Sequence, residues 1–443
     1  MRITSIGHAS YLVEAEGQRI LCDPVLSDER VAGGLLRSCP ARAVDLDAMP
    51  PPTAIALSHV HADHFHPLSW QRLSKDLPVL LPAVDRLVAR VQGMGYLNTI
   101  PLGNWQSTTL GEVRITATPS LARDTPEVAF HFQAGERSFW NTVDSDIPVE
   151  EAQRLGRVEV VAAKYQPVLV QTQILTGRGT QFDKSEIKMW LEAALAPRPD
   201  LVFPAACGMS YQPGLSEFMN HLSFPLSAHN VHRLLEQMAP PHTRVVTLLP
   251  GDVIEWEGPG WSVRKAASRF VRCLSSDTTA KAWEPFDLRG LDAPAAEAEV
   301  RSLFLPHLTE YVVPRLQQAT SGPFSRYAEW DVVWQGAVHL SPDQRLTWSI
   351  DFRGGTPTLY EGPHIDANYF LHVSGRALVD MLSGRAGPNL FWQGGGARAY
   401  EKVFRVRDGR LEYPGPFFEV LPEFLTSMTM QRIFKIVAAV AAP

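Results

Sequence analysis

Short apolar runs rich in β-branched and aromatic residues alternate with polar turns along the first third of the chain. Runs of this length, bounded by Gly, Pro and Asn, are typical of strands. The pattern predicts strands at Tyr11–Glu14, Arg19–Cys22, Thr53–Leu57, Val79–Leu81, Val113–Ala117, Val128–Phe132 and Arg137–Val143. Sheets should therefore form the centre of this part of the chain.

Other segments show the period of an amphipathic helix, with apolar residues three and four positions apart. They are Leu68–Lys75, Asp85–Met94, Lys184–Ala196 and Ala228–Met238. Because strands and helices are intermixed, a sheet-on-sheet core with helices outside fits better than a helical bundle or a pure β-sandwich. The sequence therefore predicts the α/β class.

The apolar pattern weakens between about Val263 and Ala296, in a stretch that contains Ser-Ser-Asp-Thr-Thr and then Pro and Ala. A chain of 443 residues exceeds the roughly 250–300 residues that one core usually spans, so two domains are expected. We predict a first domain at residues 1–265, a linker at 266–295 and a second domain at 296–443.

The second domain should be of the α+β class. A long helix is expected over Ala295–Gln318, broken at Pro314, because proline lacks the N–H that a helix interior needs. The β-like segments that follow are Arg345–Phe352, Pro357–Tyr360 and Tyr369–Val373. A helix over Gly375–Ser383 should end at Gly384, since glycine is common just beyond helix C-termini.

Composition and charge exclude several classes of protein. Hydrophobic residues make up 45% and charged residues 20%, values typical of a soluble globular chain. A net charge of −6 provides no basic field for a phosphate backbone, so no nucleic-acid partner is expected. No apolar stretch is long enough for a signal-peptide core or a membrane span, which predicts a cytoplasmic protein without membrane contact.

The cysteines are few and widely separated. They are Cys22, Cys39, Cys207 and Cys273, and none belongs to a Cys-x-x-Cys, Cys-x-His or Cys-x-x-His pair. This spacing excludes a local zinc ribbon, a Rieske cluster and a thioredoxin-type motif. We expect small buried side chains at these positions.

Four candidate metal ligands directly follow a predicted strand. They are His59, His61, Asp63 and His64. Two imidazoles two positions apart can point from an extended loop into one metal ion, while Asp63 and His64 turn toward a second ion. A single histidine is usually a surface or core residue, but ligands at this density would carry a heavy desolvation cost without a cation. We therefore predict a metal site, with His66 beside it or at the surface.

This run resembles the His-x-His-x-Asp-His signature of the metallo-β-lactamase superfamily at all four ligand positions. The resemblance covers roughly residues 1–260 and implies the αββα sandwich of that superfamily. Asp23 occupies the place of an aspartate that lies under the metals, and Gly7–Ser10 looks like an opening strand. The resemblance also implies a bridging aspartate, which we assign to Asp144; the alternative is that Asp144 and Asp146 only cap a loop.

The sequence departs from that pattern before the bridging aspartate. The typical member supplies a third histidine for the first metal between the signature and the bridging aspartate, and this chain has no histidine at that position. Asp124 is the best replacement and Glu127 the alternative, because His131 lies too late, inside the following strand. Such a site would be richer in oxygen and negative charge, which suits iron or manganese, although affinity order alone favours zinc.

The last ligand of the superfamily is a histidine far downstream. The candidates are His221, His229, His232 and His242. We favour His221 because it lies in a loop rich in Gly, Ser and Pro, whereas His229 and His232 fall on an expected surface helix.

Further segments look like one branch of the superfamily, the metallo-β-lactamase domain of CMP-N-acetylneuraminate hydroxylase and its bacterial relatives. They are Arg123-Asp124 with Asn141–Asp144, Pro204–Gly208 and Leu249–Asp252. Val373–Leu378 and Met381–Arg385 are similar to the C-terminal, sterol-carrier-like domain of those proteins. Members of that branch carry a Rieske cluster, for which this chain has no cysteine–histidine pairs, so the resemblance implies a separate electron donor.

Two reactions follow from this site. The ligand change and the closer resemblance favour a di-iron oxygenase or hydroxylase acting on a small molecule; the di-iron β-hydroxylases of nonribosomal peptide pathways also replace the third histidine by a carboxylate. The superfamily as a whole favours a zinc or mixed-metal hydrolase of an ester, amide or phosphoester. A metal-binding protein without catalysis is the third interpretation.

The expected cofactors are two divalent metal ions, iron before zinc or manganese. The second domain either covers a face of the catalytic domain, mediates a homodimer, or lines a ligand cavity. Nothing in the sequence identifies the substrate.

Overall fold

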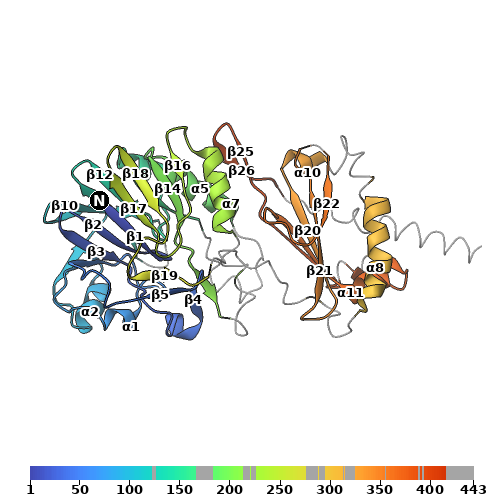
Figure 1. The fold of residues 1–443 in the computed structure, drawn as a ribbon, viewed down its shortest axis with the longest axis horizontal. Helices are drawn as coiled ribbons and strands as arrows, with labels where there is room; N and C mark the ends of the chain where they lie inside the picture. The colour runs from blue at the N-terminus through green and yellow to red at the C-terminus, as the bar shows by residue number, and fades with distance from the viewer. Residues whose placement is uncertain are drawn as a thin grey trace, which may run out of the picture. The chain divides into compact units, whose positions relative to one another are not determined.

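A computed structural model of the chain describes residues 1–121, 126–165, 183–212, 220, 226–275, 288, 295–312, 314, 325–354, 356–387, 390–391 and 394–415. The chain divides into two compact units (Figure 1). The first comprises Met1–Gln173, Phe182–Lys281 and Asp408–Leu411; the second comprises Ile174–Gln181, Ala282–Arg407 and Glu412–Pro443.

The larger sheet of the first unit has the strand order β18-β17-β1-β2-β3-β6-β7-β8. The strands are β1 (Arg2–Gly7), β2 (Ser10–Ala15), β3 (Gln18–Cys22), β6 (Ala54–Ala56), β7 (Val79–Pro82), β8 (Thr99–Leu102), β17 (Val253–Glu257) and β18 (Gly260–Arg264). Pairing is antiparallel from β18 to β3 and parallel from β3 to β8. Strands β1, β3 and β6 therefore run in the same direction and end at the same edge.

The second sheet of this unit has the order β16-β14-β13-β12-β11-β10-β9. Its strands are β9 (Ser107–Leu110), β10 (Val113–Pro119), β11 (Val128–Ala134), β12 (Arg137–Asn141), β13 (Val160–Lys164), β14 (Leu201–Ala205) and β16 (Arg244–Val245). Two short ribbons pair β15 (Met209–Tyr211) with β4 (Leu36–Ser38) and β19 (Val271–Cys273) with β5 (Arg42–Val44). Both large sheets match the predicted strand-rich centre.

The core lies between the two sheets. Alternate residues of both, including Tyr11 and Val13 from one and Phe130, Phe139 and Phe203 from the other, form a single buried apolar cluster. Helices cover the outer faces: α1 (Pro67–Trp70), α2 (Asp85–Gly93), α3 (Val149–Arg154), α5 (Lys184–Leu195) and α7 (Ala228–Met238). This helix–sheet–sheet–helix layering confirms the predicted α/β sandwich.

The second unit contains a five-stranded sheet in the order β22-β21-β20-β23-β24. Its elements are α8 (Glu297–Pro306), a π-helix (His307–Val312), α10 (Ser325–Glu329), β20 (Val333–His339), β21 (Arg345–Asp351), β22 (Thr358–Glu361), β23 (Tyr369–Ser374), α11 (Gly375–Leu382) and β24 (Ala397–Glu401). A separate hairpin near the end of the described chain pairs β25 (Arg405–Arg407) with β26 (Arg410–Glu412). The mixture of helices and strands in the second unit is that of an α+β fold; the predicted sterol-carrier likeness stays a prediction.

Two predicted helices differ from the structure. The helix expected over Leu68–Lys75 is the single turn α1, which has a proline at its first position. The long helix expected over Ala295–Gln318 is α-helical over Glu297–Pro306 and π-helical over His307–Val312, while residues 313 and 315–318 lie outside the described residues. Pro306 has no N–H to continue the α-helical hydrogen bonds, which accounts for the change of geometry there.

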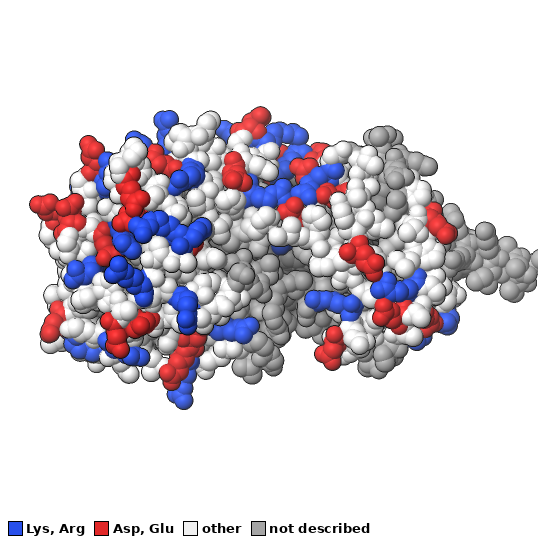
Figure 2. Space-filling view, in the orientation of Figure 1, with Lys and Arg blue, Asp and Glu red and all other residues white. Residues whose placement is uncertain are grey.

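The described helices include none that is long and apolar enough to cross a membrane. Basic and acidic side chains are interspersed over the face drawn in Figure 2, without one large field of either sign. The expectation of no nucleic-acid partner stays a prediction.

Replacing Phe139 by Ala should lower the free energy of unfolding of the first unit by about 3–5 kcal/mol, because the ring stacks on Phe132 and Phe203 with centroids 6.0 and 6.4 Å apart. Urea denaturation followed by circular dichroism measures this. The exposed neighbour Gln133 is the control, and Gln133→Ala should change the free energy by less than about 0.5 kcal/mol. Equal effects of the two changes would contradict the position of Phe139 in the core.

Candidate metal centre

The predicted ligands lie where several strands of the first unit end. The loop after β6 carries His59 and His64, both fully buried, and the turn after β12 carries Asp144. Asp23 directly follows β3, and His8 occupies the turn between β1 and β2. Because β1, β3 and β6 end at one edge, these side chains converge there.

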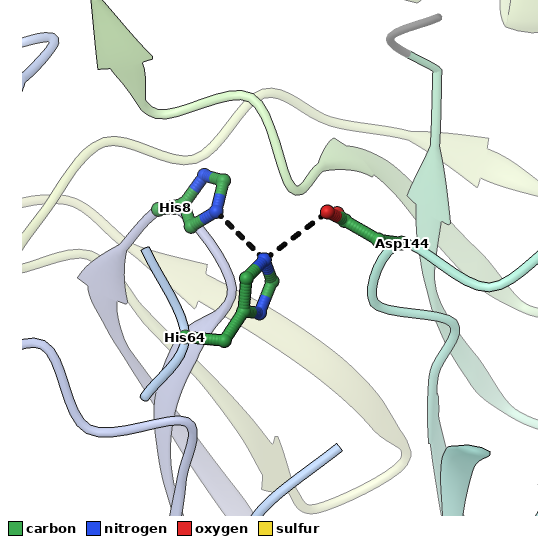
Figure 3. Close-up of side chains that lie close together, drawn as sticks. All are labelled: His8, His64 and Asp144. Atoms are coloured by element: carbon green, nitrogen blue, oxygen red, sulfur yellow. Dashed lines mark hydrogen bonds and ion pairs between the residues drawn. The ribbon is translucent and has the colours of Figure 1, made fainter. Parts of the chain in front are cut away.

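One group of possible ligand atoms consists of His59, His61 and Asp144. The Nε2 atom of His59 lies 2.9 Å from Nδ1 of His61 and 4.0 Å from Oδ2 of Asp144. The second group consists of His8, His64 and Asp144 (Figure 3). Asp144 belongs to both groups, which is the arrangement expected of a bridging carboxylate.

Distances in the second group are short. Nε2 of His64 lies 3.1 Å from Nε2 of His8 and 3.2 Å from Oδ2 of Asp144. Asp63 is also close, with its Oδ2 atom 3.3 Å from His8 Nε2 and 3.8 Å from His64 Nε2. Ligand atoms about 2.0–2.1 Å from a tetrahedral ion are roughly 3.3 Å apart, so this donor set fits a divalent cation.

The carboxylate of Asp23 orients the histidines from behind. Its Oδ1 accepts the backbone N–H of Ser58 at 2.8 Å; its Oδ2 accepts the Ser58 hydroxyl at 2.7 Å and lies 3.1 Å from Nδ1 of His64. Since the Ser58 proton goes to Asp23, Ser58 Oγ accepts from Nδ1 of His59 at 2.9 Å. Both histidines thus carry a proton on Nδ1, which leaves Nε2 as the atom that faces the centre.

The charges at the centre are strongly coupled. Burial and the neighbouring His64 hold the pKa of His59 well below its usual value. Burial alone would lower the pKa of His64, but Asp144 and Asp63 raise it well above its usual value. Burial would raise the pKa of Asp144, but His64 keeps it well below its usual value. In this state the buried carboxylates pair with a protonated His64. A bound metal cation would take over the positive charge that this proton supplies.

Backbone strain gathers at the same place. Of the non-glycine residues with left-handed φ angles, four lie at or beside the centre: His8 at 55°, Asp23 at 38°, Val143 at 54° and Ala206 at 56°. Positive φ is least favourable for a β-branched residue such as Val143. The side chains of Ala9, Val143 and Ala206 form a small buried cluster that holds these turns.

The structure brings together five of the residues predicted from the sequence: His59, His61, Asp63, His64 and Asp144. Asp124 and His221 lie outside the described residues. His8 was missed as a possible ligand. Its signal was the Gly7-His8 turn directly after a buried strand, which the sequence analysis took only for part of an opening strand.

The other carboxylate and histidine candidates lie outside both donor groups. Glu127 accepts the Ser120 hydroxyl at 2.5 Å, and burial raises its pKa to about 7. His232 lies on α7, where its ring nitrogens are 3.2 Å from Thr247 Oγ1 and from Glu236 Oε1. His131 pairs with Trp140 of the next strand, on the face turned away from the inter-sheet core.

Residues 18–183 match the family model described as a β-lactamase superfamily domain. This segment is thus similar to β-lactamase superfamily domains. Together with the two donor groups, the match supports a metal-dependent enzyme of the metallo-β-lactamase fold, as the signature predicted.

Curated relatives share only part of their length with this chain. A protein of Mycolicibacterium smegmatis that bears the name of a Rieske 2Fe-2S iron-sulfur protein is 35% identical over 101 residues, which are 22% of this chain and 19% of that protein. A protein of the same name from Mycobacterium tuberculosis is 32% identical over 100 residues. The chain thus spans about a fifth of the length of the curated relatives it matches.

Two solved structures illustrate the range of similar proteins. CmlA, a diiron β-hydroxylase from Streptomyces venezuelae, is 19% identical, covers 47% of this chain and 45% of its own, and has a TM-score of 0.36. Igni18, a metallo hydrolase from Ignicoccus hospitalis, is 16% identical, covers 58% and 99%, and has a TM-score of 0.41. At these values neither likeness decides between oxidation and hydrolysis.

Replacing Asp23 by Asn should weaken metal binding by roughly 10- to 100-fold, because a neutral amide orients His59 and His64 less firmly. Chelator competition with Zn²⁺ measures the affinity. Asp76→Asn, at an exposed position, is the control and should bind zinc like the unmodified protein. Unchanged affinity in the Asp23 variant would contradict its orienting role.

His131 makes a pH-dependent contribution to stability. Burial, with the nearby Arg114, lowers its pKa to about 4, while the unfolded chain has the ordinary value of about 6.5. Between these values the unfolded state binds more protons, so stability should fall as pH decreases from about 6.5 to about 4. Denaturation at several pH values in this range gives the free energy of unfolding of the unmodified protein and of His131→Leu. The unmodified protein should lose about 2–3 kcal/mol more than the variant as pH falls. Parallel pH profiles of the two proteins would contradict this contribution of His131.

Proposed function

We propose that the first unit is a dinuclear iron enzyme that activates oxygen to oxidise a small molecule. The observation that carries the proposal is the composition of the two donor groups, each of which contains two histidines and a carboxylate. Two histidines and one carboxylate, with open positions, are typical of non-haem iron oxygenases, whereas zinc hydrolases more often use three histidines on one ion.

His59, His61 and Asp144 would hold one ion, and His8, Asp63, His64 and Asp144 the other. The predicted ligands Asp124 and His221 remain proposals for the remaining positions. When bound, a pair of iron ions would supply the redox chemistry that activates oxygen. The residues of this chain hold the ligands in place and exclude water, since His59 and His64 are fully buried.

The loop that carries Asp144 is fixed by a buried lysine. The Lys164 amine donates to the Asp144 backbone carbonyl and to Oδ1 of Asp146 at 2.7 Å, and it lies 4.1 Å from the centroid of the Trp190 ring. Trp190 Nε1–H donates to the same Asp146 oxygen at 2.9 Å. Glu127, with its pKa near neutrality, is placed to hold or release a proton beside Asp144.

The name of the curated relatives supports an oxidative reaction, since it states that those proteins contain a 2Fe-2S cluster. The 443 residues of this chain contain four cysteines and no Cys-x-His pair. We propose that an electron donor outside these 443 residues delivers the electrons. We also propose that the chain is related to the CMP-N-acetylneuraminate hydroxylase branch of the superfamily.

Metal analysis tests the reaction class. The full chain, expressed with both iron and zinc supplied, should purify with two equivalents of iron and absorb in the near ultraviolet. Two equivalents of zinc, together with release of acid from ester or phosphoester substrates, would establish the hydrolase instead. Bound metal without either activity would indicate a metal-binding protein that is not an enzyme. The hydrolase result and the binding-protein result would each contradict the proposal.

Substitutions should separate the two metal positions. Asp144→Ala should lose both ions because both donor groups share this carboxylate, whereas His59→Ala should lose about one equivalent. Elemental analysis of the purified variants gives the stoichiometry. The exposed His242→Ala is the control and should keep both ions. Full metal content in both site variants would overturn the assignment.

A further inference from the structure

A cavity of about 120 Å³ opens beside His8 within the first unit. Its wall includes both polar and apolar groups, among them Arg37, Arg42, Tyr165, Phe203 and Leu248. Because His8 belongs to one of the donor groups and also lines the cavity, a molecule bound here would reach the metal centre from this side. The cavity is therefore the candidate substrate pocket.

Arg42 is a buried cation with unused donors. The residue, at the start of β5, is 8% exposed, and its Nη2 donates to the Val25 carbonyl at 2.5 Å. Among the described residues, neither Nε nor Nη1 of Arg42 has a hydrogen-bond partner. Burial lowers the pKa of the guanidinium to about 10, so it stays positively charged at neutral pH. Buried, charged donors without partners are rare in proteins because their desolvation is not compensated.

Two glycines shape the approach to this guanidinium. A Cβ atom at Gly7, whose φ is +115°, would lie 2.5 Å from Nη1 of Arg42. A Cβ atom at Gly208 would lie 2.4 Å from the backbone nitrogen of His8. The chain thus uses glycine where Arg42 passes the end of β1 and where the loop after β14 passes His8. Arg42 and His8 both line the cavity.

We propose that Arg42 binds an anionic group of the substrate, a carboxylate or a phosphoryl oxygen, in this cavity. The inference rests on the proposed function in that it names the substrate class of the same site. An anion fits better than a neutral group because it would compensate the charge of the guanidinium, whose Nε and Nη1 find no acceptor among the described residues. Arg37, which also lines the cavity, adds to the positive potential there.

Equilibrium binding of small anions to the full chain tests the proposal without turnover, so its outcome does not depend on the reaction. Sodium acetate and inorganic phosphate are titrated separately by calorimetry. At least one should bind, and Arg42→Met should weaken that binding by roughly 10-fold or more, since a charge-assisted hydrogen bond is lost. Arg42→Lys, which keeps the positive charge, should lose less anion affinity than Arg42→Met. Tighter binding of acetate would indicate a carboxylic acid, and tighter binding of phosphate a phosphorylated substrate.

The controls separate Arg42 from the metals and from misfolding. Arg137→Met removes an arginine that packs on Trp256 outside the cavity and should leave anion affinity unchanged. Asp144→Ala, expected to lose the metals, should still bind the anion. Ala228→Phe, which fills the cavity wall from a half-buried position, should weaken binding with Arg42 intact. Absence of binding of both anions, equal affinity of Arg42→Met and the unmodified protein, or loss of binding in Asp144→Ala would each overturn the proposal.

Discussion

The buried carboxylate of Asp23 is the contact on which the arrangement of the metal centre depends. It joins the ends of two strands, because it follows β3, accepts two hydrogen bonds from Ser58 after β6, and contacts the imidazole of His64 in the same loop. Asp23 N–H in turn donates to the carbonyl of Ala56 at 2.9 Å. One side chain therefore sets the spacing of two strand ends and the proton positions of two histidines. The two ligand groups are possible only because that spacing is fixed.

Local sequence predicted the layers and the signature loop well, and long-range contacts poorly. The strands of the first unit were visible because apolar residues recur where one face packs against the other sheet. By contrast, β20 was not predicted, although it is the central strand of the second unit: it is buried along its whole length, so it lacks the alternation of a half-exposed strand.

The same difference applies to the site. His59, His61, Asp63 and His64 are neighbours in the sequence, so their density alone pointed to a metal. His8 lies 56 positions from His64, and only the pairing of β1, β2 and β3 brings its ring to the centre. Arg42 was not distinguished from the other basic residues, because burial without a hydrogen-bond partner is a property of the folded chain.

The left-handed turns at His8, Asp23 and Val143 have a consequence for how the protein carries its metals. Each such residue costs about 1–3 kcal/mol of backbone strain, and each stands next to, or is itself, a residue of the centre. In the metal-free chain, ion pairs of His64 with Asp144 and Asp63 hold these turns together. A bound cation would replace those pairs, so part of the free energy of metal binding would keep the strained turns folded.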